Sequence, residues 1–126
     1  MGPVYLFSAV ARHNQWLSLR QATVAGNIAN ANTKGFKALD IEPFEKAVDG
    51  ARLAMTATHA AHIGVPAATV ASPEVRAAEP WDVTHSGNSV SLEQELIKSS
   101  EVGRAYRLNA NVVKAFHRML LASAKG

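Results

Sequence analysis

Two histidines three residues apart come nearest, in type and spacing, to a metal-binding group. His59 and His62 could face one divalent ion, with His85 or a carboxylate as a third ligand. No glutamate stands between them in a His-Glu-x-x-His frame, so the general base of a zinc hydrolase is missing. The surrounding Ala- and Thr-rich segment is typical of a surface turn. We therefore predict no bound metal; a metal-dependent enzyme that uses these histidines is the alternative that elemental analysis would test.

Other catalytic chemistry has no matching residues in the chain. There is no cysteine, which excludes a disulfide framework, a thiolate zinc site and a thiol nucleophile. Ser86-Gly87 and Ser72-Pro73 lack the Gly-x-Ser-x-Gly elbow, and no phosphate-binding or dinucleotide-binding glycine motif occurs. We therefore predict that the protein is not an enzyme, and that it uses no cofactor and no small-molecule substrate.

The composition describes one domain whose core is poor in large side chains. The chain has 126 residues, of which 48% are hydrophobic and only 6% are aromatic, and much of the hydrophobic share is alanine. Helices built from such residues are expected to need partners for burial. The net charge is +3, but Lys and Arg are spread along the chain among ten acidic residues, which does not favour nucleic-acid binding.

Residues 1–32 are predicted to form a long amphipathic helix. Val10, Leu17 and Val24 recur every seven residues, and Ile28 follows one turn later. The apolar run 4–11 resembles a secretory signal, but no Lys or Arg precedes it and the amphipathic pattern continues through residue 28. We therefore expect export without a cleaved signal peptide. No run of about 18 apolar residues indicates a membrane span.

Asparagines and a glycine predict where this helix ends. Asn27, Asn30 and Asn32 lead into Thr33-Lys34-Gly35-Phe36, and these residue types tolerate the backbone of helix ends and tight turns. We expect a positive φ at Gly35, as the second central residue of a type II turn requires.

The combined pattern Arg-Gln-x-x-x-Ala-x-Asn-Ile-Ala-Asn-x-x-Thr-x-Gly-Phe-Lys-Ala, from residue 20 to 38, resembles the N-terminal signature of bacterial flagellar axial proteins. These are the rod, hook and hook-associated subunits that stack into the flagellum. Those families usually carry proline where this chain has Lys34. The residues that carry the signature are Arg20, Asn27, Ile28, Asn30, Thr33, Gly35 and Phe36.

Residues 91–126 are predicted to form the second long helix. Ser91 and Gln94 form a capping-box pattern at its start. A heptad seam follows, with small residues at its centre; its positions are Leu92, Leu96, Ser99, Gly103, Tyr106, Ala110, Val113, His117 and Leu120. Small residues permit close approach but weaken an isolated pair, so we expect neighbouring subunits to complete the contact. The core face of an ordinary helical hairpin is the alternative.

Residues 33–90 form an irregular middle segment in this interpretation. A short helix is expected from Pro43 to Met55, because Pro43 suits a first helical turn. The rest is rich in Ala, Thr, Pro and Val and is expected to be loop, with one or two short strands near Val65–Val70 and Trp81–Thr84.

The segment before the last helix strengthens the resemblance. Gly87, Asn88, Val90, Leu92 and Glu95 match the Gly-Asn-x-Val-x-Leu-x-x-Glu motif of one family of proximal rod proteins, whereas the Pro-Asn-Val-Asn motif of its sister family is missing. Where the family usually has aspartate, this chain has Ser91, which is an equally suitable helix cap.

The resemblance implies a mainly α fold in which long N- and C-terminal helices pack as an antiparallel, coiled-coil-like pair. It implies a structural subunit of the proximal rod, a helical drive shaft that crosses the periplasm and transmits torque. The implied partners are other copies of the chain, other rod subunits, and rod-base, membrane-ring and export-gate proteins. A small helical adaptor or export-associated binding protein is the alternative. The expected assembly seam comprises Val10, Leu17, Val24, Ile28, Leu96, Gly103, Ala110, Val113 and Leu120.

Overall fold

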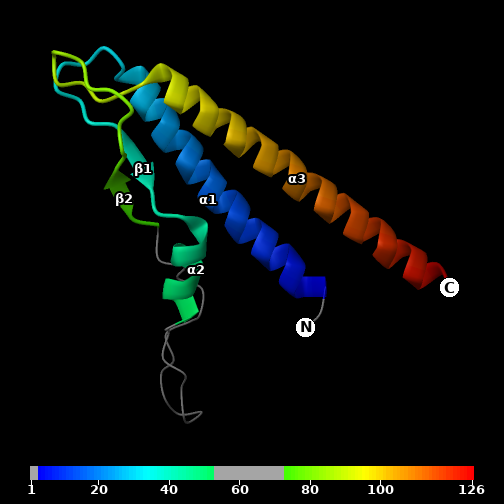
Figure 1. Ribbon diagram of the computed structural model, residues 1–126. Coiled ribbons are helices and arrows are strands. Elements are labelled where there is room, and N and C mark those ends of the chain that lie inside the picture. The colour runs from blue at the N-terminus through cyan, green and yellow to red at the C-terminus, as the bar shows by residue number, and fades with distance from the viewer. Residues whose placement is uncertain (1–2, 53–72) are drawn as a thin grey trace, which may run out of the picture.

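Two long helices and a small two-stranded sheet make up the structure, a computed structural model that describes residues 3–52 and 73–126. The elements follow in the order α1 (Pro3–Ala29), β1 (Leu39–Ile41), α2 (Phe44–Arg52), β2 (Val75–Ala77) and α3 (Leu92–Lys125). Helices α1 and α3 run antiparallel and side by side, with the sheet and α2 along the other side of α1 (Figure 1). This confirms the predicted mainly helical fold.

Helix α1 ends next to an asparagine whose side chain bonds back to the last turn. The Asn30 side chain donates to the Gly26 carbonyl at 2.8 Å, and the Thr33 hydroxyl lies 3.1 Å from the Asn30 side-chain oxygen. Side chains that bond to the last turn compete with further helix, so the chain leaves the helix after Ala29. The heptad residues Leu17 and Val24 are buried, as an apolar stripe that faces the core requires.

Helix α3 begins with the predicted cap. Ser91 has extended backbone angles, φ −101° and ψ 117°, and its hydroxyl accepts from the Gln94 N–H. The second arm of a capping box is not made, because the Gln94 side chain instead donates to the Glu79 carbonyl at 2.9 Å. Glu93 and Glu95 lie in the first turn, where the helix dipole favours negative charge.

The middle segment contains two short strands, but not at the predicted places. β1 pairs antiparallel with β2 in the register Leu39 opposite Ala77 and Ile41 opposite Val75. The prediction of a strand at Trp81–Thr84 was wrong: these residues form loop, and the Thr84 N–H bonds to the nearby Asn88 carbonyl instead of a strand partner. The prediction for Val65–Val70 lies outside the described residues.

The short helix was predicted at nearly its observed place. α2 begins at Phe44, one residue after the expected Pro43, whose carbonyl accepts from the Lys46 and Ala47 N–H groups. The predicted end at Met55 falls beyond the described part of the chain.

The apolar core is small. Its buried hydrophobic residues are Leu17, Val24, Ala38, Ile41 and Val102. They lie where α1, α3 and β1 meet, so the helix pair depends on polar contacts as well. No helix in the two described stretches is long and apolar enough to cross a membrane.

Candidate assembly site

The turn after α1 has the geometry expected from its glycine. Gly35 has φ +74°, and the Phe36 N–H donates to the Thr33 carbonyl at 3.2 Å, which closes a four-residue turn. The Gly35 N–H donates to the Ser86 carbonyl at 3.0 Å. Gly87 also has positive φ, +81°, and a Cβ there would lie 3.6 Å from the Gly35 Cα. The two glycines therefore bring the two motif segments into contact.

Asn88 joins the segments by its side chain. It is 2% exposed, and its amide nitrogen donates to the Asn30 carbonyl at 2.8 Å and to the Thr33 carbonyl at 2.7 Å. Its side-chain oxygen accepts from the Val90 N–H at 2.8 Å. One buried amide thus bonds to three backbone groups, two of which are carbonyls that also accept a turn hydrogen bond, and it fixes the exit of α1 against the entry to α3.

Ser89 makes a second link of the same kind. Its hydroxyl accepts from the Ala38 N–H at 2.8 Å, and its own N–H donates to the Phe36 carbonyl at 3.0 Å. The half-buried Phe36 therefore contributes a backbone acceptor to this contact.

Asn27 and Glu95 form the centre of the interface between α1 and α3. Asn27 is 1% exposed and Glu95 is fully buried. The Asn27 amide nitrogen donates to Glu95 Oε2 at 3.0 Å and to the Leu39 carbonyl at 2.7 Å, while its oxygen accepts from the Leu39 N–H at 3.0 Å. Asn27 therefore holds β1 to α1 as a backbone strand would, and it also orients the buried carboxylate.

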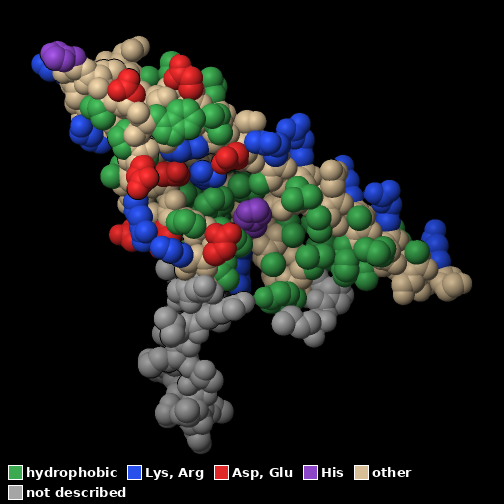
Figure 2. All heavy atoms as spheres, viewed as in Figure 1, with side chains coloured by type: hydrophobic (Ala, Val, Ile, Leu, Met, Phe, Trp, Pro, Cys, Tyr) green, Lys and Arg blue, Asp and Glu red, His purple; other side chains and the backbone are tan. Residues whose placement is uncertain are grey.

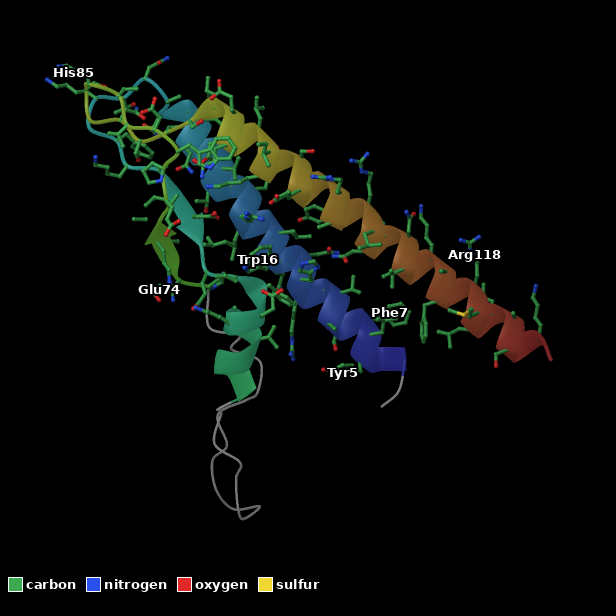
Figure 3. The ribbon with its side chains drawn as sticks, viewed as in Figure 1. Tyr5, Phe7, Trp16, Glu74, His85 and Arg118 are labelled. Atoms are coloured by element: carbon green, nitrogen blue, oxygen red, sulfur yellow. The ribbon has the colours of Figure 1, made fainter. Side chains whose placement is uncertain are left out.

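Alternating charges extend from Glu95 toward the surface (Figure 3 shows the side chains between the helices). Lys98 Nζ lies 3.2 Å from Glu95 Oε1 and 3.3 Å from Asp40 Oδ2. Arg20 then lies 3.5 Å from Asp40 and 3.3 Å from Glu101. We call the six side chains Arg20, Asn27, Asp40, Glu95, Lys98 and Glu101 the polar junction.

The polar junction satisfies its own buried atoms. Within residues 3–52 and 73–126, no buried side-chain nitrogen or oxygen lacks a hydrogen-bond partner. A buried charge pair of this kind adds little net stability over an apolar pair, but removal of one partner is costly. The junction therefore adds little stability to the observed register of the two helices. Any other register would leave its buried charges without partners and is disfavoured for that reason.

A second polar contact lies farther along the helices. The Asn109 amide nitrogen is 2.8 Å from His13 Nδ1 and 2.8 Å from the Asn14 side-chain oxygen, and the Tyr106 hydroxyl donates to the Asn14 carbonyl at 3.0 Å. At the far end, the rings of Phe7 and Phe116 meet edge to face with their centroids 5.8 Å apart.

Trp16 connects α1 to α2 (Figure 3). Its indole N–H donates to the Glu42 carbonyl at 2.8 Å, and the Arg20 guanidinium lies 5.5 Å from its ring centroid. The Phe44 ring contacts both Trp16, at 6.0 Å, and His13, at 4.8 Å. These contacts seat the short helix against α1.

The structure divides the predicted seam residues between buried and exposed positions. On α1, Leu17 and Val24 are buried, Val10 is half-buried and Ile28 is 38% exposed. On α3, Gly103 and Val113 are half-buried, whereas Leu96, Ala110 and Leu120 are exposed. Whether these residues contact neighbouring subunits stays a prediction.

The face of α3 that contacts α1 is not the predicted heptad. Its buried residues are Glu95, Lys98, Val102 and Asn109, one position before the predicted seam, or about 100° around the helix. The predicted seam residues Leu96, Gly103 and Ala110 therefore lie beside the contact with α1, whereas Val113 and Leu120 lie on the same side of the helix as Val102. The heptad was predicted from apolar residues. The observed contact is largely polar, and its buried polar groups bond to side chains on α1 and β1.

Two stripes of exposed apolar side chains flank this inner face of α3. Leu92, Leu96 and Tyr106 lie on one side and are 37–62% exposed. The other stripe comprises Ile97, Leu108, Val112 and Met119, which are 38–63% exposed. We call these the first and second apolar flanks; both stay exposed beside α1, although the Tyr106 hydroxyl of the first flank reaches Asn14.

Sequence reasoning missed Ser89, Lys98 and Asn109 as contact residues, and it used Asn88 and Glu95 only as motif positions. A signal for the inner face existed, because Glu95, Val102, Asn109 and Phe116 are spaced by seven. Because two of its four residues are polar, this heptad resembles a stripe that faces solvent.

The histidine prediction is not tested. His59 and His62 lie outside the described residues, and in the described part of the chain no three His, Asp or Glu side chains are arranged to hold a metal ion. His85 is exposed at the outer end of the loop before α3 (Figure 3).

Comparison with known proteins gives a consistent result. Residues 14–37 match the family described as flagella basal body rod protein. The chain is 41% identical over 129 aligned positions to the flagellar basal body rod protein FlgB of Agrobacterium fabrum, an alignment that covers 99% of this chain and 96% of that protein. It is 28% identical over 102 positions to the FlgB proteins of Escherichia coli K12 and Shigella flexneri, with 75% of this chain and 74% of each of those proteins covered.

Proposed function

Because the chain belongs to the FlgB family of flagellar basal body rod proteins, we propose that it builds the rod by packing its two long helices against those of neighbouring subunits. It is a structural subunit of the proximal rod and is located in the flagellar basal body. The observation that carries the proposal is the set of nine large hydrophobic residues that α3 leaves 37–63% exposed. Side chains so densely placed along one helix are typical of an assembly surface.

The proposed contact uses the two apolar flanks of α3. All three residues of the first flank, Leu92, Leu96 and Tyr106, are positions of the predicted heptad seam. The small seam residues Gly103 and Ala110 allow a neighbouring helix to approach closely there. On α1 the proposed contact residues are Val10 and Ile28, whereas Leu17 and Val24 support the helix pair from inside. A helix with apolar residues on several sides needs more than one partner helix, as in the core of a multi-helix tube.

The family signature has a different role in this proposal. Asn27, Asn30, Thr33 and Gly35 fix the angle at which the chain leaves α1, and Arg20 belongs to the polar junction. They set the relative position of α1 and α3, so that the contact residues of the two helices face neighbouring subunits in one fixed arrangement.

We infer that the partners are other copies of the chain, further rod subunits, and proteins of the rod base, membrane ring and export gate. We also infer that the subunits form a periplasmic rod and transmit torque there. No catalytic activity, cofactor, nucleic acid or small-molecule substrate belongs to this proposal.

The variant Leu96→Glu tests the assembly surface. Leu96 is 62% exposed, so a charge there should leave the fold of the monomer intact but should prevent burial against a neighbouring helix. Ser100→Glu is the matched control, because Ser100 is exposed on the outer face of the same helix. Both full-length variants would be returned to cells that lack the protein, and motility and isolated basal bodies would be examined.

We expect Ser100→Glu to restore motility and rods, and Leu96→Glu to restore neither while retaining the circular dichroism of the unmodified protein. Normal rods with Leu96→Glu would refute the proposed contact. Discrete soluble complexes with a non-axial protein, without incorporation into basal bodies, would favour the helical adaptor.

A further inference from the structure

The acidic residues are confined to the middle of the chain, although basic residues occur along all of it. All ten Asp and Glu residues lie between residues 40 and 101, whereas residues 102–126 contain no acid. That last stretch carries the five exposed cations Arg104, Arg107, Lys114, Arg118 and Lys125. Toward the C-terminal end of α3 the visible charges are all Lys and Arg, and the acids lie over the opposite end (Figure 2).

These cations are free to meet an external partner. Their spacing places them on one side of α3, opposite the inner face that contains Val102. No ion pair joins any of them to a carboxylate in the described stretches. Arg118 points away from α1 in Figure 3.

The end of α3 also exposes apolar side chains. Phe116 is the last half-buried residue of the helix, and every residue after it is exposed. Met119 is 60% exposed, Leu121 49% and Leu120 38%. We call residues 117–125 the α3 tip: an apolar helix end that carries Arg118 and Lys125.

The opposite end of the molecule has a complementary surface. A hollow of about 280 Å³ lies between the end of α1 and the start of α3, and Val90, Leu92, Asp82 and Glu93 line it. Leu92 is 47% exposed, and the neighbouring Trp81 is 64% exposed. We call this surface the head hollow.

The two carboxylates of the head hollow are available as acceptors. Asp82 and Glu93 are exposed and make no ion pair with any cation in the described residues. The Glu93 backbone N–H, and then the Ser91 hydroxyl, lower the pKa of the Glu93 carboxyl, which therefore stays ionised at neutral pH.

We propose that the α3 tip of one copy docks in the head hollow of a second copy. The apolar side chains of the tip enter the hollow, and Arg118 and Lys125 approach Asp82 and Glu93. The tip and the hollow lie at opposite ends of α3, which at 34 residues is about 51 Å long. A contact between opposite ends of identical subunits does not close on itself and generates an open row. The proposal rests on the assembly function given above and adds the direction of one contact.

The helix dipoles support this orientation. The C-terminus of one α3 carries partial negative charge and would approach the N-terminus of the next α3, which carries partial positive charge. An anionic membrane is the other surface that a basic, apolar helix end could bind. A second copy is favoured because the chain presents an acidic, apolar counterpart at the other end of the same helix.

Cross-linking can test the contact cleanly because the chain contains no cysteine. One full-length variant would carry Leu121→Cys in the tip, and another would carry Asn32→Cys at the exposed edge of the hollow. After mixing and mild oxidation, we expect the tip–head disulfide to exceed both same-site disulfides. Ser100→Cys, on the outer face of α3, replaces the tip cysteine as the control and should give only background cross-linking to Asn32→Cys.

Charge reversal provides the second measurement. Arg118→Glu with Lys125→Glu should lower the tip–head yield about tenfold, which corresponds to about 1.4 kcal/mol. Asp82→Lys with Glu93→Lys on the other copy should restore it, and high salt should weaken the unmodified contact. Circular dichroism would confirm that each variant keeps its helices.

Several outcomes would overturn the proposal. They are a tip–head yield no higher than the control, a dominant tip–tip disulfide, or no recovery with the compensating pair. Binding of the tip to phosphatidylglycerol vesicles in place of any tip–head disulfide would assign it to the membrane. Normal rods from the Arg118→Glu and Lys125→Glu variant would refute only this contact, whereas failure of the assembly proposal would be seen with Leu96→Glu.

Discussion

Replacement of Lys98 by methionine should be among the most destabilising changes at the helix interface. Lys98 bridges the fully buried Glu95 at 3.2 Å and the partly buried Asp40 at 3.3 Å. Methionine preserves most of the side-chain volume but removes the positive charge. Asp40 keeps Arg20, whereas Glu95 keeps only the Asn27 amide, which leaves its charge without a cation.

The expected cost follows from that loss. An uncompensated buried carboxylate costs about 3–5 kcal/mol of unfolding free energy, and the remaining Asn27 hydrogen bond places the expected value near the lower end. A small domain has only about 5–15 kcal/mol in total, so the loss would be readily measurable. The double variant Lys98→Met with Glu95→Gln removes both charges and should cost only about 1–2 kcal/mol, which is at least about 1 kcal/mol less than Lys98→Met alone.

Urea unfolding of the purified full-length protein, followed by far-ultraviolet circular dichroism, would measure these values. Lys114→Met is the matched control, because Lys114 is an exposed lysine on the same helix and its loss should change the unfolding free energy by less than about 0.5 kcal/mol. If Lys98→Met matched this control, or if the double variant were less stable than Lys98→Met, the polar junction would not have the role argued for it.

Three further outcomes are expected. Gly35→Val should lower the unfolding free energy by about 1–3 kcal/mol, because a branched side chain at φ +74° strains the backbone even though nothing lies within 4 Å of an added Cβ. Lys34→Pro restores the residue usual in the family and should be tolerated, so equal rod assembly by the two variants would refute the turn argument. Leu17→Asp should abolish folding and rod incorporation, because it places a charge at a position that is 2% exposed; normal motility would contradict the assigned core. The pKa of Glu93 is lowered in the folded state, first by its own backbone N–H and then by Ser91. The ionised carboxylate therefore stabilises the fold above the ordinary pKa of 4.5, and this stabilisation is lost as pH falls through the folded-state pKa. In an NMR titration of Ser91→Ala, the Glu93 pKa should rise but stay below 4.5.

Most elements could be predicted from the sequence because their signals are local. The heptad of Leu17 and Val24 marks the buried stripe of α1, and Ser91 marks the start of α3. The positive φ of Gly35 followed from the turn chemistry of neighbouring residues. Helix periodicity, capping and turns depend on residues within about one helical turn of each other, so they can be read without knowing the fold.

The strands depended on distant residues. Val75–Ala77 is a strand of only three residues, all with exposed side chains, so it is too short to give a detectable alternation of apolar and polar residues. It forms because β1 lies beside it and offers free backbone groups for pairing. The two strands are far apart in the sequence, so no local pattern could indicate their pairing.

The inner face of α3, like the strands, could not be predicted from local sequence patterns. By itself, the sequence determined that α3 is a long helix with an apolar heptad seam, and it did not determine which side meets α1. Glu95 can be buried there because Asn27 and Lys98 satisfy its carboxylate, with Asp40 of β1 balancing the lysine. A buried charge is stable only with partners at bonding distance, and those partners are brought together by tertiary structure. Tertiary structure therefore turned a partly polar heptad inward and left the apolar flanks exposed.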